Sequence, residues 1–269
     1  MTSTRATRLG LVVWTILVVL FLWIPLVIIC VYAFNSSNIQ GWPIAGFSTR
    51  WFHDAWHNPD ARSALVLSLN AAWRATAIAL LLGTAAAAAV ARFKFFGREA
   101  ISFLLILPLA LPGVITGIAL NSFFANNPIH HFSPGIWTIV IGHATFCVVI
   151  VYNNVAARLR RTQTSLTEAS MDLGADGWQT FRYVTFPVIS TALVSGALLA
   201  FALSFDEVIV TTFTAGAQNT LPIWIFGNIQ RGVELPQVNV VVFFIIVMTI
   251  IPVTIAQRIA RDTGILRRR

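Results

Sequence analysis

Long apolar stretches, each of about the length needed to cross a bilayer, constrain this chain more than any other feature of its sequence. A helical crossing needs about 20 such residues, and six stretches of this kind can be read along the chain. The chain is 57% hydrophobic and 10% charged, whereas a soluble domain carries about 25% charged residues. We therefore expect an all-α, polytopic membrane protein with one transmembrane domain (residues 1–269) and spans at about 9–34, 64–91, 101–125, 135–157, 188–212 and 238–259.

The basic residues indicate how these spans are oriented. Fourteen of the 18 Lys and Arg residues flank the span ends that share one side of the membrane, and only Arg50, Arg62 and Arg231 fall on the other side. Because Lys and Arg are enriched in cytoplasmic loops, both termini are expected in the cytoplasm. Arg74 lies inside the second span, where its long side chain can reach the outer interface. The net charge of +8 is then mostly a topology signal, and no nucleic-acid partner is expected.

The longest polar run between two spans, residues 158–187 (the 158–187 segment), begins with signals for a short helix. Ser165 and Glu168 have the spacing of a capping box, in which the hydroxyl accepts from the N3 amide and the carboxylate reaches back. Gly174 is suited to the left-handed position that ends a helix. One face of this helix is apolar, and it consists of Leu166, Ala169 and Leu173.

A second short helix is indicated directly after this glycine. Asp176 and Gln179 repeat the capping signature, and Pro187 can begin the next span because a missing N–H does little harm at a helix start. The pattern predicts a helix, a glycine turn and a helix between spans four and five. Such a compact element can dock on a soluble partner, or it can be a pair of interfacial helices that lies on the lipid headgroups.

The same segment carries a family signature. Glu168-Ala169-Ser170, followed by Gly174 and then by Phe186-Pro187, resembles the "EAA" signature of permease subunits in binding-protein-dependent ABC importers. Ser170 stands where that signature usually has a second alanine, and Phe186 stands where leucine is usual. The resemblance implies a cytoplasmic coupling helix that sits in a cleft of the ATP-hydrolysing subunit, with ATPase-coupling roles for Glu168, Ala169, Ser170, Gly174 and Ala175.

Over about residues 10–260 the chain resembles the spermidine/putrescine-type permeases. Shorter stretches carry this wider resemblance, among them residues 93–98, 142–147, 204–209 and Leu221-Pro222. It implies a small organic cation as the substrate, most specifically a polyamine, although relatives of this architecture also serve opines and amino-acid derivatives. A stand-alone secondary carrier is the rival from another class, but it needs coupling acids at mid-membrane, where this sequence has none.

The resemblance also implies a set of partners. They are two ATP-binding subunits at the cytoplasmic face, a second, homologous permease subunit, an extracytoplasmic substrate-binding protein and the lipid bilayer of a bacterial inner membrane. The chain has no GxxxxGK[ST] phosphate loop, which is the motif that cradles nucleotide phosphates. We therefore expect a transport subunit that is not an enzyme and holds no cofactor, with ATP and Mg²⁺ bound by the partner ATPase subunits.

Four residues are candidates for the substrate path. Asp206 and Glu207 follow Pro187 by about 19 residues, or about 28 Å of helix, which places them at the outer edge of the hydrocarbon. They are either simply hydrated at the interface or part of a negatively charged mouth that attracts cations. Asn121 adds a polar group to the outward half of span three, and Trp224 can attract a cation through its ring face.

Two further features remain open to more than one interpretation. Pro108, Pro112, Gly113 and Gly117 interrupt span three, which indicates either a packing kink or a broken helix along a transport path. His143 is an ionisable residue within span four and hence a functional candidate, although a neutral histidine hydrogen-bonded between helices is the simpler interpretation. No metal site is expected in this sequence.

Overall fold

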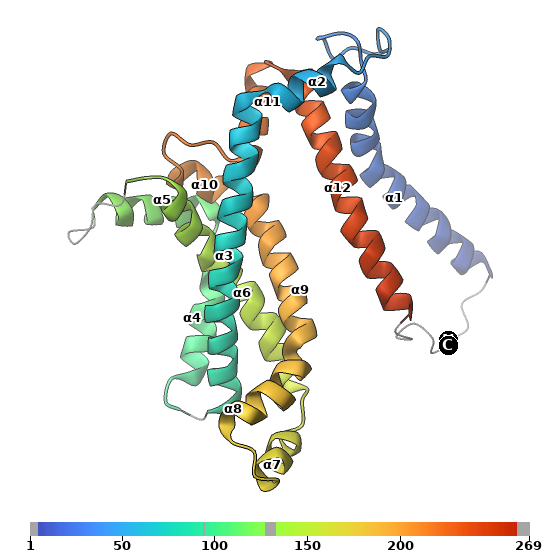
Figure 1. The fold of residues 1–269 in the computed structure, drawn as a ribbon. Coiled ribbons are helices and arrows are strands. Elements are labelled where there is room, and N and C mark those ends of the chain that lie inside the picture. Colours follow the sequence, from blue (N-terminus) through green and yellow to red (C-terminus); the bar gives the residue numbers. More distant parts are fainter. Residues whose placement is uncertain (1–4, 94, 127–132, 263–269) are drawn as a thin grey trace. The chain divides into compact units, whose positions relative to one another are not determined.

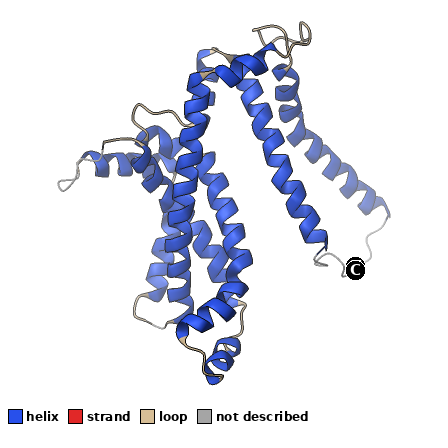
Figure 2. Ribbon diagram, in the orientation of Figure 1, coloured by secondary structure: helices blue, strands red, loops and turns tan. Residues whose placement is uncertain are grey.

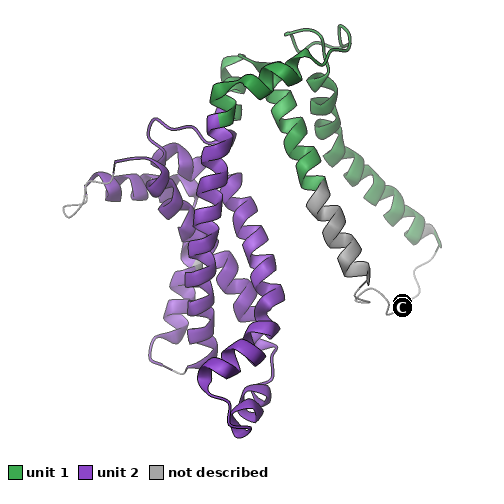
Figure 3. Ribbon diagram, viewed as in Figure 1, with its two compact units in different colours: residues 1–62, 225–269 green, residues 63–224 purple. Residues whose placement is uncertain are grey.

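The computed structural model describes residues 5–93, 95–126 and 133–262. Lys94 and Arg267 to Arg269, which count among the fourteen basic residues above, lie outside this range. The described residues form helices joined by loops (Figure 2), and their β structure is limited to one isolated bridge between Asn35 and Phe47. It forms two compact units, one of residues 1–62 and 225–269 and the other of residues 63–224 (Figure 3).

The first unit is built around α1 (Arg5–Ala33), α2 (Arg50–His57) and α12 (Leu235–Asp262), with both α1 and α2 packed on α12. The rings of Phe34, Phe52 and Phe243 meet at centroid distances of 4.9–5.7 Å. Most of α1 is exposed although it is the most apolar helix of the chain. An apolar surface of this extent fits lipid as the solvent.

The second unit contains most of the remaining helices, with α6 (Ile136–Arg160) at its centre (Figure 1). Helix α6 packs against α9 (Phe186–Phe205) and α4 (Arg98–Ala110), and buried alanines of α3 (Pro59–Arg92) lie in the same core. Its other elements are α5 (Gly113–Ala125), α7 (Ser165–Asp172), α8 (Gly177–Thr180), the π-helix η1 (Phe181–Thr185) and α10 (Ile209–Thr214). Helix α11 (Leu221–Arg231) begins in the second unit and continues into the first from residue 225.

Small residues allow the helices to approach α6 closely, as is common in membrane bundles. A Cβ atom built on Gly83 of α3 would lie 2.8 Å from the carbonyl oxygen of Val148. A Cβ atom on Gly196 of α9 would lie 3.4 Å from the Cα atom of Val151. The glycine in α3 therefore has no room for a larger side chain, and the glycine in α9 has very little.

Four helices in the described residues are long and apolar enough to cross a membrane, namely 7–33, 59–92, 136–160 and 177–205. The pair α4 and α5 adds a fifth crossing if it counts as one broken span, with its axes at 104°. Helix α12 runs from Leu235 to Asp262, and its stretch Leu235–Ile250 is apolar. The all-α polytopic fold is thus confirmed, whereas the count of six crossings stays a prediction.

One expected detail of the spans differs in the structure. The helix of span five runs over residues 177–205 rather than 188–212, because it is continuous with the helix before Pro187 and is broken at Asp206. The guanidinium of Arg74, which was expected to reach towards the outer interface, lies 5.0 Å from the ring centroid of Trp137. Because a cation is attracted to the face of an indole ring, this contact holds the arginine at the start of α6.

Candidate functional site

The 158–187 segment folds as the helix, glycine turn and helix that the sequence predicts. Helix α7 ends before Gly174, which has φ +86°, a conformation that residues with a Cβ avoid. Asp176 then caps α8: its carboxylate accepts from the Gln179 amide at 2.7 Å, and the Gln179 side chain accepts from the Asp176 amide at 3.0 Å. The second capping box is therefore confirmed.

The first capping box, Ser165 with Glu168, is wrong. Ser165 is the first residue of α7, and no side-chain bond caps this helix. Thr164 occupies the N-cap position with helical backbone angles (φ −63°, ψ −29°), and its carbonyl accepts from the Glu168 amide at 3.1 Å. A capping side chain needs an extended backbone at the N-cap, and the helical backbone of Thr164 does not provide one.

The second helix of the segment does not stop before the next span. Helix α8, η1 and α9 form one continuous helix from Gly177 to Phe205. Pro187 has no N–H to bond four residues back, and the turn before it is a π-helix, in which the Phe186 N–H donates to the Phe181 carbonyl five residues back. Motion of this part of the segment is therefore transmitted directly into α9.

Side-chain contacts tie the segment to the helices above it. Ser170 of α7 and Thr180 of α8 share a hydroxyl–hydroxyl bond of 3.1 Å. Arg92 at the end of α3 donates to the hydroxyl of Thr185, and Arg158 Nε donates to the Val188 carbonyl at 2.9 Å. The segment is thus attached to α3 and α6 as well as to α9.

The solvent-facing surface of the segment carries several exposed apolar side chains. Leu166 is 49% exposed, Trp178 66% and Leu173 90%. Glu168 and Ala169 are exposed in the same turns, while Ser170 and Ala175 are half-buried. Single exposed apolar residues are ordinary on proteins, but here several lie together on one small element, which is typical of an interaction site. The remaining exposed apolar side chains of the segment are Met171, Tyr183 and Phe186.

A second candidate site lies where α9 gives way to α10. Asp206 follows the last residue of α9 and is exposed. Glu207 is half-buried, and its carboxylate accepts from the Val210 amide at 2.9 Å. This bond satisfies one of the free N–H groups at the start of α10. The two adjacent acids therefore differ in role. Glu207 caps α10, whereas the carboxylate of Asp206 is exposed on the surface.

His143 connects this junction to the centre of the unit. Its ring is 1% exposed, with Nδ1 2.8 Å from Ser204 Oγ of α9 and Nε2 2.8 Å from Thr211 Oγ1 of α10. Thr211 Oγ1 in turn donates to the Glu207 carbonyl at 2.7 Å. Because Thr211 donates its single proton in that bond, we assign Nε2 as the donor to Thr211 and the Ser204 hydroxyl as the donor to Nδ1. The predicted hydrogen bonding of His143 between helices is confirmed.

Helix α10 is further held between α5 and α6. A Cβ atom on Gly117 of α5 would lie 2.5 Å from the Phe213 ring, and Thr138 of α6 donates to the Thr214 carbonyl at 2.6 Å. The interruption predicted in span three is a true break, since α4 ends at Ala110 and α5 begins at Gly113. The break leaves α5 free to pack along α10.

The other path candidates lie apart from this bonded chain. Asn121 is exposed on α5, one turn beyond Gly117, and among the described residues no hydrogen bond joins it to Asp206 or Glu207. Trp224 of α11 is 5% exposed, so a substrate could reach its ring only in another conformation. Their roles in the path remain predictions.

The family of the chain follows from comparison with known proteins. Residues 79–263, which include the 158–187 segment and the α9–α10 junction, match the profile of the family described as "Binding-protein-dependent transport system inner membrane component". The chain belongs to this permease family. It is therefore a membrane-embedded transport component, and the predicted resemblance to permease subunits of binding-protein-dependent importers is confirmed.

Three similar proteins are permease proteins of named transport systems. The permease is 37% identical over 238 residues to the putrescine transport system permease protein PotI of Escherichia coli, covering 84% of this chain and 83% of that protein. It is 31% identical over 245 residues to the spermidine/putrescine transport system permease protein PotC of Haemophilus influenzae, covering 91% and 93%. It is 29% identical over 259 residues to the putative 2-aminoethylphosphonate transport system permease protein PhnV of Salmonella paratyphi A, covering 94% of each.

A solved structure supports the fold of the permease. The structure of a bacterial ABC transporter that imports the acidic polysaccharide alginate aligns with a TM-score of 0.67 at 16% identity. The alignment covers 97% of this permease and 99% of that chain. At this identity the likeness concerns the fold alone.

Most side-chain hydrogen bonds at the α9–α10 junction involve Ser204, Thr211 or Thr138. The sequence analysis did not identify these three residues as candidates. One signal was present. A buried imidazole needs a partner at each nitrogen, and Ser204 and Thr211 are hydroxyl residues on either side of the acidic pair. The pairing itself depends on how α6, α9 and α10 pack.

Proposed function

We propose that this permease is one of two membrane subunits of an ATP-driven importer and that it converts the closure of the ATPase subunits into movement of its helices. The exposed apolar face of the 158–187 segment is the observation that carries this proposal. The segment is small, contains the Gly174 turn and the Asp176 cap, and is continuous with α9. Such an element can take up force from a partner and pass it to the transmembrane region.

Each coupling candidate has a structural task in this proposal. Gly174 makes the turn that sets the angle between α7 and α8, and Ser170 fixes the two helices by its bond to Thr180. Ala169 is small enough to allow close approach of the partner, Ala175 follows the turn, and Glu168 offers a charge on the exposed face. ATP and Mg²⁺ are bound and used by the partner ATPase subunits, and this chain contributes no catalytic residue or cofactor.

The proposed substrate is a small organic cation, most specifically a polyamine. Relatives named for putrescine and spermidine transport support this substrate class. Asp206 supplies an exposed carboxylate at the α9–α10 junction, and attraction grows with the number of charges on the cation. Glu207 maintains the junction by capping α10. An opine, an amino-acid derivative or a zwitterion remains the alternative within the same importer class, as the relative named for 2-aminoethylphosphonate illustrates.

The orientation and partners complete the proposal. The charge pattern supports a cytoplasmic location for the 158–187 segment and both termini. In this proposal two ATP-binding subunits dock on that side. A second, homologous permease subunit lies beside this one, and a substrate-binding protein delivers the cation from outside. Alternating access then needs two conformations that differ by only a few kcal/mol.

Reconstitution tests the proposal directly. The permease, its second permease subunit, the ATPase subunits and the binding protein are placed in proteoliposomes, and uptake of radiolabelled putrescine is measured with and without ATP. Uptake that requires both ATP and the ATPase subunits is expected. Accumulation by this chain alone, driven by an ion gradient, would identify a secondary carrier instead.

A further inference from the structure

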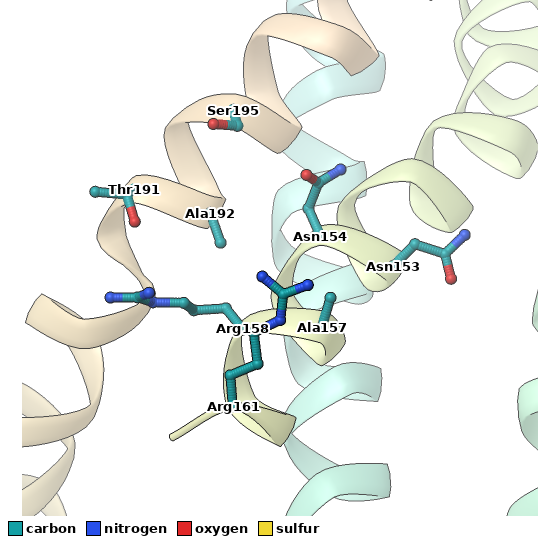
Figure 4. A pocket seen from close by; sticks show the side chains of 8 residues that line it. All are labelled: Asn153, Asn154, Ala157, Arg158, Arg161, Thr191, Ala192 and Ser195. Carbon is teal, nitrogen blue, oxygen red and sulfur yellow. The ribbon is translucent and has the colours of Figure 1, made fainter. Parts of the chain in front are cut away.

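A hollow lies between α6 and α9, at the point where α6 leads into the 158–187 segment. It has a volume of about 400 Å³ and opens to the surface along the last two turns of α6. Figure 4 shows its lining side chains, which come from these two helices. Ala157 of α6 and Ala192 of α9 leave the space that larger side chains would fill.

Two arginines give the hollow a positive charge. Arg158 and Arg161 both line it, and no carboxylate does. The Nε–H of Arg158 donates to the Val188 carbonyl, which fixes the guanidinium. Its two terminal nitrogens remain available to donate to a ligand. In the part of the chain that the structure describes, neither arginine forms an ion pair with Asp or Glu. Guanidinium groups without an acidic partner favour a phosphate or carboxylate oxygen as ligand.

Neutral hydrogen-bonding groups continue the hollow towards the middle of the membrane. The deeper part of the hollow is lined by Asn153 of α6 and by Thr191 and Ser195 of α9. The helical rise from Asn153 to Arg161 is about 12 Å. Such groups are costly on a surface that faces only acyl chains. They can donate to the ester oxygens of a lipid just as the arginines can bind its phosphate.

Beyond these polar groups the same side of α9 becomes apolar. Leu198 and Leu199 are both exposed there, about one turn beyond Ser195. From the end of α6 inwards, the surface therefore passes from positive charge to neutral donors and then to aliphatic side chains. This order matches the phosphate, ester region and acyl chains of a phospholipid. A free phosphate uses only the first part.

We propose that the hollow between α6 and α9 binds an anionic phospholipid, with its phosphate held by Arg158 and Arg161. The site lies at the end of α6 that leads into the 158–187 segment, so a bound lipid bridges the two helices that flank the coupling element. Basic pockets at the cytoplasmic ends of membrane helices are a known form of recognition for anionic headgroups. The inference concerns lipid binding alone and stands apart from the transported substrate.

Native mass spectrometry of the assembled importer, purified in mild detergent, measures which lipids stay bound. The wild type is expected to retain phosphatidylglycerol or cardiolipin, and the double variant R158Q/R161Q is expected to lose roughly tenfold or more of it. R160Q is the matched control, because Arg160 lies on the same turn but does not line the hollow. Equal amounts of bound anionic lipid in the wild type and the double variant would overturn the proposal. This is also the result expected if carboxylates of a partner subunit fill the hollow.

A second measurement guards against misassembly of the double variant. R158K/R161K keeps both charges and is expected to retain part of the lipid, since Lys also binds phosphate, though as a point charge. On the wild-type importer, dioctanoyl phosphatidylglycerol is expected to raise the thermal unfolding midpoint more than dioctanoyl phosphatidylcholine of the same chain length. Equal stabilisation by both lipids, or by inorganic phosphate alone, would overturn the assignment to an anionic lipid.

Discussion

The imidazole Nε2 of His143 lies 2.8 Å from the hydroxyl of Thr211 and thereby joins α6 to α10. The bond belongs to a directed chain that runs from Ser204 through the ring to Thr211 and on to the Glu207 carbonyl. Every hydroxyl proton in this chain has a defined acceptor. The ends of α9 and α10, which hold the two acids, are therefore positioned by a residue of the neighbouring helix.

Replacing Thr211 by Val is expected to weaken this junction. The variant keeps the side-chain volume but leaves His143 Nε2–H without an acceptor in a buried site, at a cost of about 1–3 kcal/mol. Thermal unfolding of the purified permease in detergent measures the loss. Thr212→Val is the matched control, because Thr212 is exposed and bonds only within its own helix, to the Val208 carbonyl. Equal midpoints for the two variants would contradict the bonded chain.

Replacing Gly117 by Leu is expected to displace α10 from α5. A Cβ atom at this position already lies 2.5 Å from the Phe213 ring, and overpacking of this kind costs typically 1–3 kcal/mol. Gly113→Ala provides the comparison, since its Cβ would lie 3.4 Å from Ile209, close to ordinary contact. Protease accessibility of the α9–α10 junction measures the displacement. We expect faster cleavage for Gly117→Leu than for Gly113→Ala, and the same rate for both would count against close packing of α5 on α10.

Local signals explain which parts of the fold the sequence could predict. The helix–turn–helix of the 158–187 segment follows from Asp176, Gln179 and Gly174, whose effects depend on neighbours a few residues away. The same reasoning misplaced the cap at Ser165, because the chain leaving α6 keeps Thr164 helical. A capping motif indicates what a side chain can do, while the incoming backbone decides whether it does so.

Contacts between distant helices account for what could not be predicted. The break of span five at Asp206 could be placed only with α10 in view, because Glu207 caps that helix. The partners of His143 lie 61 and 68 residues further along the chain, and periodicity carries no information at that separation. The hollow between α6 and α9 likewise depends on which sides of the two helices face each other.

Gly174→Pro is expected to abolish the coupling of ATP hydrolysis to uptake. Gly174 has φ +86° and donates its N–H to the Met171 carbonyl at 2.9 Å, whereas proline fixes φ near −65° and has no N–H to donate. The turn between α7 and α8 therefore cannot form. Membrane insertion is expected to be intact, because the apolar spans are unchanged.

Gly177→Ala is the control for the coupling variant. Gly177 lies in the same segment without a positive φ, and a Cβ atom there meets no heavy atom within 4 Å. Putrescine uptake and ATPase rate are measured together in proteoliposomes for both variants. Normal uptake by Gly174→Pro would remove the 158–187 segment from the coupling role, whatever the behaviour of the control.

Asp206→Asn is expected to raise the KM for putrescine about fivefold, the effect of roughly one exposed charge pair near contact distance, and to affect trivalent spermidine more than divalent putrescine. Glu207→Gln separates charge from structure, because its amide oxygen can still accept the Val210 N–H. If both acids attract the substrate, Glu207→Gln raises KM without lowering the unfolding midpoint. Uptake kinetics over a range of salt concentrations provide the measurement, since screening should shrink the difference between wild type and variant. Unchanged KM in both variants at low salt would place the acids outside the substrate path and leave them as the hydrated end of α9 and the cap of α10.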